Sequence, residues 1–193
     1  AIMPLATLFL AHFFLPNEPL TRRRLVGFLL GFMGIIVLLG PSALLEIKTT
    51  GITLYAQLAI LGGALCYAAG TIIARLKPES DDILTSAAVL SVASILMLPV
   101  SILHENPWIK PVSSASAFAM LFLGVIATAV ATVIYFRLLR QAGATFLSQI
   151  NYLIPVWALG MGVVFLNESI AWNNVLALVM ILSGIALSQV RFS

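Results

Sequence analysis

The chain has 193 residues, of which 61% are hydrophobic and only 9% are charged, with a formal net charge of +3 and a mean hydropathy of +1.10. Soluble domains carry about 25% charged residues, so this composition excludes a soluble globular domain and predicts a membrane protein. The lipid bilayer is therefore the first expected partner.

The first 17 residues contain no charged side chain, and they begin at Ala1 inside an apolar run. A secretory signal peptide would show a basic leader and a small-residue cleavage site, and neither is evident. We therefore expect the chain to begin within a membrane helix, as a fragment of a longer protein.

Six longer uncharged runs follow, and each has at least 21 residues. They are 25–45, 49–74, 83–103, 111–136, 141–167 and 169–190. A helix needs about 20 apolar residues to cross the hydrocarbon core, and helices satisfy their backbone groups without water. We therefore predict an all-α integral membrane protein, a helical bundle with six full transmembrane helices plus part of a seventh.

The short connections divide lysine and arginine unequally between the two sides of the membrane. With 137–140 taken as the fifth connection, one side has eight basic residues and the other has only Lys48 and Lys110. Basic residues are retained in the cytoplasm, which predicts a cytoplasmic arginine cluster after the first helix and a cytoplasmic C-terminus. The eight residues are Arg22, Arg23, Arg24, Arg75, Lys77, Arg137, Arg140 and Arg191.

Two sequence segments resemble each other, "FLPNEPLTRRR" at 14–24 and "FLNESIAWNN" at 165–174. Glu18 aligns with Glu168 at an offset of 150 residues, and five spans end between the copies. An odd number of spans places the second copy in the opposite orientation, which is typical of the inverted repeats of secondary transporters. The same offset pairs Leu20 with Ile170, Gly27 with Ala177 and Gly34 with Gly184, and an offset of 151 pairs Pro4 with Pro155.

This repeat predicts the domain organisation. We expect residues 1–45 to end the first five-helix repeat, as its helices four and five, and residues 46–193 to form the second five-helix repeat, helices six to ten. If the two repeats have similar lengths, over about 100 residues precede Ala1. The whole protein would then be a ten-helix (5+5) inverted-repeat transporter.

The stretch "LGVIATAVATVIYFRLLRQAGATFLSQINYLIPVWALGMGVVFLNE" at 123–168 and the stretch "PLATLFLAHFFLPNEPLTRRRLVGFLLGFMGIIVLLG" at 4–40 carry a family resemblance. In order and spacing they are similar to helices eight and nine, and helices four and five, of the EamA-type branch of the drug/metabolite transporter superfamily. The segment "AWNN" at 171–174 departs from the Gly-rich or more polar stretch common there. The resemblance implies export of amino acids or related amphiphilic compounds.

The uncharged spans limit the chemistry of the site. A phosphate or nucleotide ligand favours a buried Lys or Arg, whereas neutral polar groups suit a neutral or zwitterionic solute. Cys66 has no His or acidic residue in its run, so we expect no catalytic residues and hence no enzyme. We also expect no metal site, no cofactor and no nucleic-acid partner.

Polar residues on shared helical faces are the candidates for a substrate cavity. In 141–167, a spacing of i, i+3, i+4 and i+7 places four side chains, from Ser148 to Pro155, on one face. The threonines of 111–136 and the polar residues of 49–74 repeat this pattern. The cavity candidates are Asn151, Tyr152, Gln149, Ser148, Tyr67, Gln57, Thr128, Thr132 and Thr7.

Each of these features also has a structural interpretation. Ser and Thr in membrane helices often bond to their own backbone or a neighbouring helix, and the glycines at 27, 31 and 34 suit helix packing. Pro4 and Pro155 are predicted helix kinks. Glu18 and Glu168 are predicted structural residues at the start of the following helix, where Thr21 is a further capping candidate.

We therefore expect a secondary transporter, an exporter of small neutral, zwitterionic or amphiphilic metabolites, working by alternating access in a bacterial inner membrane. A transport-inactive membrane sensor or scaffold of the same fold, and a nucleotide-sugar or phosphate-type antiporter of the same superfamily, are the alternatives. The coupling ion, with the proton as candidate, and a homodimeric state are left open.

Overall fold

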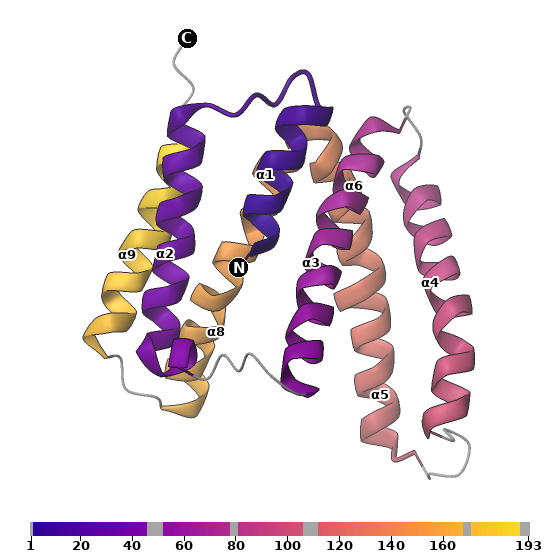
Figure 1. Cartoon of the computed structure of the whole chain (residues 1–193). Helices are drawn as coiled ribbons and strands as arrows, with labels where there is room; N and C mark the ends of the chain where they lie inside the picture. Colours follow the sequence, from indigo (N-terminus) through magenta and orange to yellow (C-terminus); the bar gives the residue numbers. More distant parts are fainter. Residues whose placement is uncertain (1, 46–51, 78–80, 106–111, 168–170, 190–193) are drawn as a thin grey trace. The chain divides into compact units, whose positions relative to one another are not determined.

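The computed structural model describes residues 2–45, 52–77, 81–105, 112–167 and 171–189, and the regular structure within these ranges is helical (Figure 1). The predicted all-α membrane fold is confirmed for this part of the chain. The elements are α1 (Ile2–Phe14), α2 (Arg22–Leu45), α3 (Ile52–Leu76), α4 (Asp82–Glu105), α5 (Ser114–Phe122), the π-helix η1 (Leu123–Val130), α6 (Ala131–Ala142), α7 (Ala144–Ser148), α8 (Ile150–Leu166) and α9 (Trp172–Gln189).

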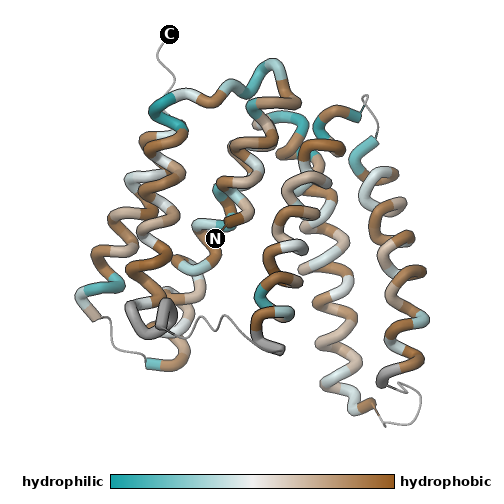
Figure 2. Tube along the Cα trace, viewed as in Figure 1, coloured by the Kyte–Doolittle hydropathy of each residue, from teal (hydrophilic) through white to brown (hydrophobic). Residues whose placement is uncertain are grey.

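Six helical stretches of the described chain are long and apolar enough to cross a membrane. Each covers most of one predicted run, and the shorter apolar helix α1 corresponds to the predicted partial span. Figure 2 shows hydrophobic residues along the helices and hydrophilic residues gathered at helix ends and corners. The stretches are Arg22–Gly40, Leu54–Leu76, Asp82–Leu103, Ser114–Ala142, Ala144–Leu166 and Trp172–Gln189.

The predicted connection at 137–140 is wrong. Helix α6 continues through both arginines, and the chain leaves helical geometry at Gly143, where φ is 92°. An arginine near a span end can keep its stem in the helix and its charged head in polar surroundings; the Nη2 of Arg140 lies 2.6 Å from Oδ2 of Asp82 in α4. Glycine reaches a positive φ without steric cost, so the break falls there instead.

Contacts divide the chain into two compact units. Unit 1 contains residues 1–76 and 142–193, and unit 2 contains residues 77–141. The boundaries of these units differ from the boundary of the predicted repeats, which lies after residue 45. The repeats were predicted from similarity between two parts of the sequence, whereas the units are defined by contacts in the folded chain. The assignment of the repeats stays a prediction.

Within unit 1, helices α2 and α9 lie side by side (Figure 1). They are antiparallel, because Gly27 contacts Gly184 whereas Gly34, two turns further along α2, contacts Ala177. A Cβ atom at Gly27 would lie 2.5 Å from the carbonyl oxygen of Gly184, so a side chain there would force the backbones apart. The glycine stripe predicted to pack helices does so, and we call this contact the α2–α9 seam.

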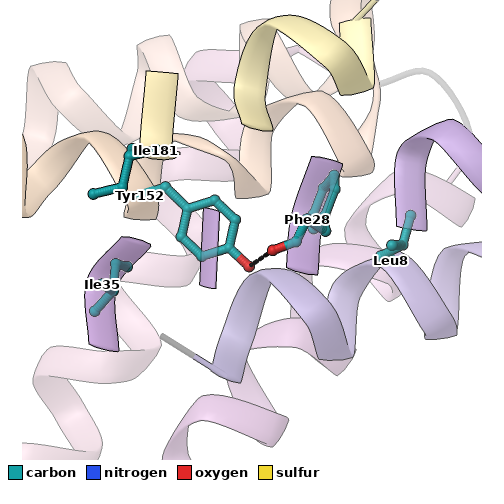
Figure 3. Packing of buried hydrophobic residues seen from close by; sticks show 5 residues of the cluster. All are labelled: Leu8, Phe28, Ile35, Tyr152 and Ile181. Atoms are coloured by element: carbon teal, nitrogen blue, oxygen red, sulfur yellow. Dashed lines mark hydrogen bonds between the residues drawn. The ribbon is translucent and has the colours of Figure 1, made fainter. Parts of the chain in front are cut away.

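A buried apolar cluster lies beside the seam and includes residues of α1, α2, α8 and α9 (Figure 3). The rings of Phe28 and Tyr152 meet edge to face, with centroids 5.9 Å apart and an interplanar angle of 68°. The quadrupoles of aromatic rings favour this arrangement. The cluster, which holds α8 against α2, consists of Leu8, Phe28, Ile35, Tyr152 and Ile181.

Unit 2 by itself contains α4, α5, η1 and most of α6. The π-helix lies in the middle of its longest helical span. The hydroxyl of Thr128 donates to the carbonyl of Leu123, five residues earlier, at 3.0 Å. This side chain therefore serves the backbone of its own helix, where π-helical turns alter the usual hydrogen-bond ladder.

Candidate functional site

Polar side chains organise the α1–α2 corner, residues 15–21. Near the end of α1, His12 accepts a hydrogen bond from a backbone N–H of the corner at Nδ1, at 3.1 Å. Thr21 caps α2, because its Oγ1 accepts the backbone N–H of Arg24 at 3.3 Å. The guanidinium of Arg24 donates to a corner carbonyl at 3.0 Å. These bonds fix the path of the segment that carries Glu18.

The side chain of Glu18 binds the first residues of α7. Its Oε1 accepts the backbone N–H of Ala144 at 2.9 Å, and its Oε2 accepts that of Thr145 at 2.7 Å. The residue is only 7% exposed, and a carboxylate suits the positive end of a helix. A Cβ atom at Gly143 would lie 2.6 Å from Oε1, so glycine makes room for the carboxylate. We call these four residues the Glu18 junction.

The prediction that Glu18 caps the following helix is wrong in the choice of helix. Thr21 occupies the start of α2, and the carboxylate of Glu18 instead caps α7. In the last turn of α3, the Nε of Arg75 lies 3.8 Å from Oε1 of Glu18, with the arginine side chain partly exposed. The repeat partner Glu168 lies outside the described residues, so its predicted role stays a prediction.

Gln149, between α7 and α8, is buried and connects this segment to α9. Its Nε2 donates to the hydroxyl of Ser188, and its Oε1 accepts a hydrogen bond from Nε2 of Gln189 at 2.6 Å. The hydroxyl of Ser188 in turn donates to its own helix backbone at 2.7 Å. The amide of this predicted cavity residue therefore bonds to a neighbouring helix in this structure.

Tyr152 is also a packed residue here. Its side chain is 1% exposed, and its hydroxyl donates to the carbonyl of Phe28 at 3.1 Å, the dashed line in Figure 3. A Cβ atom at Gly31 would lie 2.9 Å from Cδ2 of the tyrosine ring. The ring therefore fits against α2 because position 31 has no side chain.

Two more predicted cavity residues are buried and bonded to their own segments. The hydroxyl of Thr7 donates to the carbonyl of Met3 at 3.0 Å, and that of Ser148 donates to the carbonyl of Thr145 at 2.9 Å. Such bonds are common for these residue types in membrane helices. They agree with the structural interpretation of Thr7 and Ser148 rather than with contact to a solute.

The other predicted cavity residues are more accessible. In unit 1, Tyr67 is 54% exposed, and Gln57 and Asn151 are half-buried; the Nδ2 of Asn151 donates to a carbonyl one turn earlier at 3.0 Å. In unit 2, Thr128 is exposed and the hydroxyl of Thr132 donates to the carbonyl of Thr128 at 2.6 Å. Among the predicted cavity residues of unit 1, the accessible side chains are therefore the amides of Gln57 and Asn151 and the phenol of Tyr67.

The two predicted kinks have different positions in their helices. Pro4 lies in the first turn of α1 as described, where a missing N–H removes no helical bond. Pro155 lies inside α8, where it removes the donor that would reach the carbonyl of Asn151. A kink at either proline stays a prediction.

Several residues of this site were not among those predicted, namely Gly143, Thr145, Arg75, Ser188 and Gln189. A signal for the first was present, because a glycine in "RQAGATF" interrupts the apolar run 141–167. Its partner Glu18 precedes Ala144 by 126 residues, a separation that no helical periodicity connects. Among the described residues, no group of three or more His, Cys, Asp or Glu side chains could hold a metal ion.

Comparison of the sequence with known proteins identifies a matching family and two similar proteins. The sequence pattern of the "EamA-like transporter family" matches residues 54–189. The chain is similar to "Uncharacterized transporter YoaV" of Bacillus subtilis (strain 168), with 27% identity over 192 residues, covering 99% of the chain and 64% of that relative. It is also similar to "WAT1-related protein At3g02690, chloroplastic" of Arabidopsis thaliana, with 26% identity over 171 residues, covering 86% of the chain and 41% of that relative.

The chain therefore spans less than two thirds of the length of both relatives. No solved structure matches it.

Proposed function

The chain belongs to the EamA-like transporter family, and from that premise we propose that the protein is a secondary transporter that exports small neutral, zwitterionic or amphiphilic metabolites such as amino acids. Membership of the family makes the chain part of a multi-pass integral membrane protein and of a transporter family rather than an enzyme family, as predicted. The proposal adds the substrate class, the direction, and alternating access between two inverted repeats.

The symmetry of the α2–α9 seam supports the inverted repeats. The offset of 150 residues pairs Gly27 with Ala177 and Gly34 with Gly184. Exchanging each residue for its repeat partner converts the contact of Gly27 with Gly184 into a contact of Ala177 with Gly34, and both contacts occur. A two-fold axis in the membrane plane relates inverted repeats in this way. The seam therefore suits the pair of helices about which two repeats rock.

The substrate class is supported by the chemistry of the accessible side chains. Asn151, Gln57 and Tyr67 offer amide and phenol groups, which donate and accept hydrogen bonds without a net charge. Such groups fix a neutral or zwitterionic solute in a mostly apolar site. A nucleotide-sugar or phosphate-type antiporter would favour an arginine or lysine in the middle of a span, whereas the arginines of the described membrane-length helices all lie within six residues of a helix end.

The proposed location is a bacterial inner membrane, with the arginine cluster of α2 and the C-terminus in the cytoplasm. The uneven division of lysine and arginine supports this orientation. Single cysteines at Arg23 and Asn173, in a Cys66→Ala background, test it with a membrane-impermeant maleimide. We expect labelling of Asn173→Cys from outside and protection of Arg23→Cys. Equal labelling of both from outside would contradict the orientation.

Reconstitution of the protein, expressed from its complete reading frame, in liposomes tests the function. Flux of labelled amino acids, sugar phosphates and nucleotide sugars would be measured with and without a proton gradient. We expect flux of zwitterionic amino acids and none of the phosphorylated compounds. Flux of the phosphorylated compounds alone would favour the antiporter, and flux of none would favour the transport-inactive scaffold or sensor.

Asn151 provides the sharpest test of the cavity. We expect Asn151→Leu to lower flux about tenfold, because a solute would lose one hydrogen bond in a desolvated site. Asn173→Leu is the matched control, because that amide is exposed in the first turn of α9 and its loss should leave flux unchanged. Equal flux in both variants at equal expression would remove Asn151 from the cavity.

A further inference from the structure

The Glu18 junction joins parts of the chain that are distant in sequence. One carboxylate accepts two backbone N–H groups of α7, from residues 126 and 127 positions later. Hydrogen bonds to an ionised acceptor are about twice as strong as neutral ones. Helix α7 has five residues before the tightened turn at Gln149, and the first N–H groups of a helix have no partner within it. The carboxylate therefore holds α7 in place.

Helix α7 lies between a break at Gly143 and a tightened turn at Gln149. At Gly143 the backbone has a φ of 92°. Gln149 keeps helical φ and ψ, but its backbone N–H bonds three residues back, to Phe146, at 3.1 Å. A short 3₁₀-type turn within a helix often marks a hinge. Residues 144–148 are therefore the beginning of the membrane-length stretch Ala144–Leu166, bounded by two points at which the backbone departs from regular α-helix.

The two attachments of α7 differ in chemistry. At its end, the neutral amide of Gln149 binds Ser188 and Gln189 of α9, a helix of the seam. At its start, the attachment is a carboxylate from the α1–α2 corner, with the guanidinium of Arg75 nearby. The ionised attachment is the one that a single isosteric substitution, Glu18→Gln, can weaken.

We propose that the Glu18 junction is a latch, which keeps one face of the transporter closed while α7 is bound and is released when that face opens. Glu18 acts as a positioning residue, because it sets the population of the closed state without touching the solute. The closed face is the one that carries Arg22–Arg24, since Glu18 belongs to the same corner.

The latch rests on the proposed alternating access. The corner at 15–21 belongs to the first predicted repeat and α7 to the second, so a movement of one repeat against the other strains these two hydrogen bonds. A contact that exists in only one of two states biases the equilibrium toward that state. Weakening it must therefore raise the population of the open state.

Cysteine accessibility at Thr145 measures the state of the latch. Thr145 is 5% exposed, and its Oγ1 has no hydrogen-bond partner among the described residues, so Thr145→Cys sacrifices no side-chain bond. The variant is made in a Cys66→Ala background of the protein from its complete reading frame. A membrane-impermeant maleimide is then applied to either face of oriented vesicles, and the rate of labelling is measured.

Glu18→Gln is the test variant, because it keeps the shape of the side chain but replaces one acceptor oxygen with a donor. We expect labelling of Thr145→Cys to rise about tenfold or more, as the loss of a bond to a charged group implies, and only from the face that carries Arg22–Arg24. Gly143→Ala should act in the same direction, because its Cβ would lie 2.6 Å from Oε1 of Glu18. Gly143→Ala also provides the test of the latch if the Glu18→Gln protein does not fold.

Two controls separate a latch from general loosening. Asp81→Asn alters an exposed helix cap, in which Oδ1 accepts the backbone N–H of Ile83 at 2.8 Å, and it should leave labelling of Thr145→Cys unchanged. Ser86→Cys places the reporter at a buried hydroxyl position near the start of α4, in unit 2. Its labelling should not change when Glu18 is substituted.

The outcomes are distinct. A rise confined to Thr145→Cys and to the expected face supports the latch. Unchanged labelling in both Glu18→Gln and Gly143→Ala overturns it, as does a rise from the opposite face or an equal rise at Ser86→Cys. The assay needs no solute, so a failed substrate screen would refute the transport proposal without deciding the latch.

Discussion

The α2–α9 seam and the Glu18 junction lie in the same unit but are built differently. In the seam, two backbones approach so closely that an added Cβ at Gly184 would lie 2.5 Å from a carbonyl oxygen of α2. In the junction, one carboxylate reaches a five-residue helix through two hydrogen bonds. One contact depends on the absence of side chains, and the other on a single side chain.

This difference indicates which contact can change during a working cycle. If the backbones of α2 and α9 separate, all of the van der Waals contacts along the seam weaken together, because each depends on the distance between the two helices. Hydrogen bonds at the ends of helices are directional and few, and water can replace the protein partner. The seam therefore suits a permanent axis, whereas the junction suits a contact that is made and broken.

The largest effect should come from breaking the seam. Gly184→Leu would drive a side chain against Gly27 and Gly31 of α2, and we expect a loss of about 3 kcal/mol or more in the free energy of unfolding. Unfolding in mixed micelles measures this loss. Gly160→Leu is the control, because nothing lies within 4 Å of a Cβ there. Equal losses in the two variants would mean that the seam is not a close contact.

A smaller effect should follow from removing the attachment of α7 to α9. Gln149→Leu would remove two hydrogen bonds to α9, one to the hydroxyl of Ser188 and one from the exposed amide of Gln189, each worth about 1 kcal/mol. Thermal unfolding in detergent would show the loss as a lower midpoint. The exposed Gln141 provides the matched substitution, Gln141→Leu, which should have little effect.

Tyr152→Phe should cost about 1 kcal/mol, because it removes the bond to the carbonyl of Phe28 and keeps the ring in its place against Gly31. Tyr55 is 73% exposed, so Tyr55→Phe should leave the free energy of unfolding almost unchanged. The two values come from the same titration in mixed micelles. A Tyr152→Phe protein as stable as the parent would show that the hydroxyl is not bonded in solution.

The smallest effect, and one of opposite sign, is expected at the junction itself. Thr145→Val replaces a buried hydroxyl that has no partner in the described structure, so stability should stay equal or rise by about 1 kcal/mol or less. Thr7→Val makes the same change where the hydroxyl donates to Met3, and it should be slightly destabilising. A clear loss at Thr145 would reveal a hydrogen bond that the described residues do not contain.

Much of the fold was predictable because insertion of a helix into the membrane depends on the hydrophobicity of a short continuous stretch of sequence. The uncharged runs marked the six membrane-length helices, and the glycines at 27 and 34 indicated a packing face. The boundary at 137–140 failed, because a charge count does not show that Arg140 can stay in a helix and pair with Asp82. Gly143, a backbone signal, marked the true break.

The site was less predictable. Periodicity predicts that Ser148, Asn151 and Tyr152 share one helical face, but it does not show what lies opposite them. Tyr152 proved to face α2, and Gln149 to face α9. A polar side chain can bind a solute or a neighbouring helix with the same groups. The rotation of each helix about its axis decides between them.

The sequence by itself therefore determined that this protein lies in a lipid bilayer and where the membrane-length helices of its described chain run. Each of these depends on the transfer of a residue from water to lipid or on its distance along the chain, and both are local properties. The tertiary structure alone decided that Glu18 caps α7 rather than α2. That bond joins residues 126 positions apart, and it forms only after packing has brought the α1–α2 corner and Gly143 together.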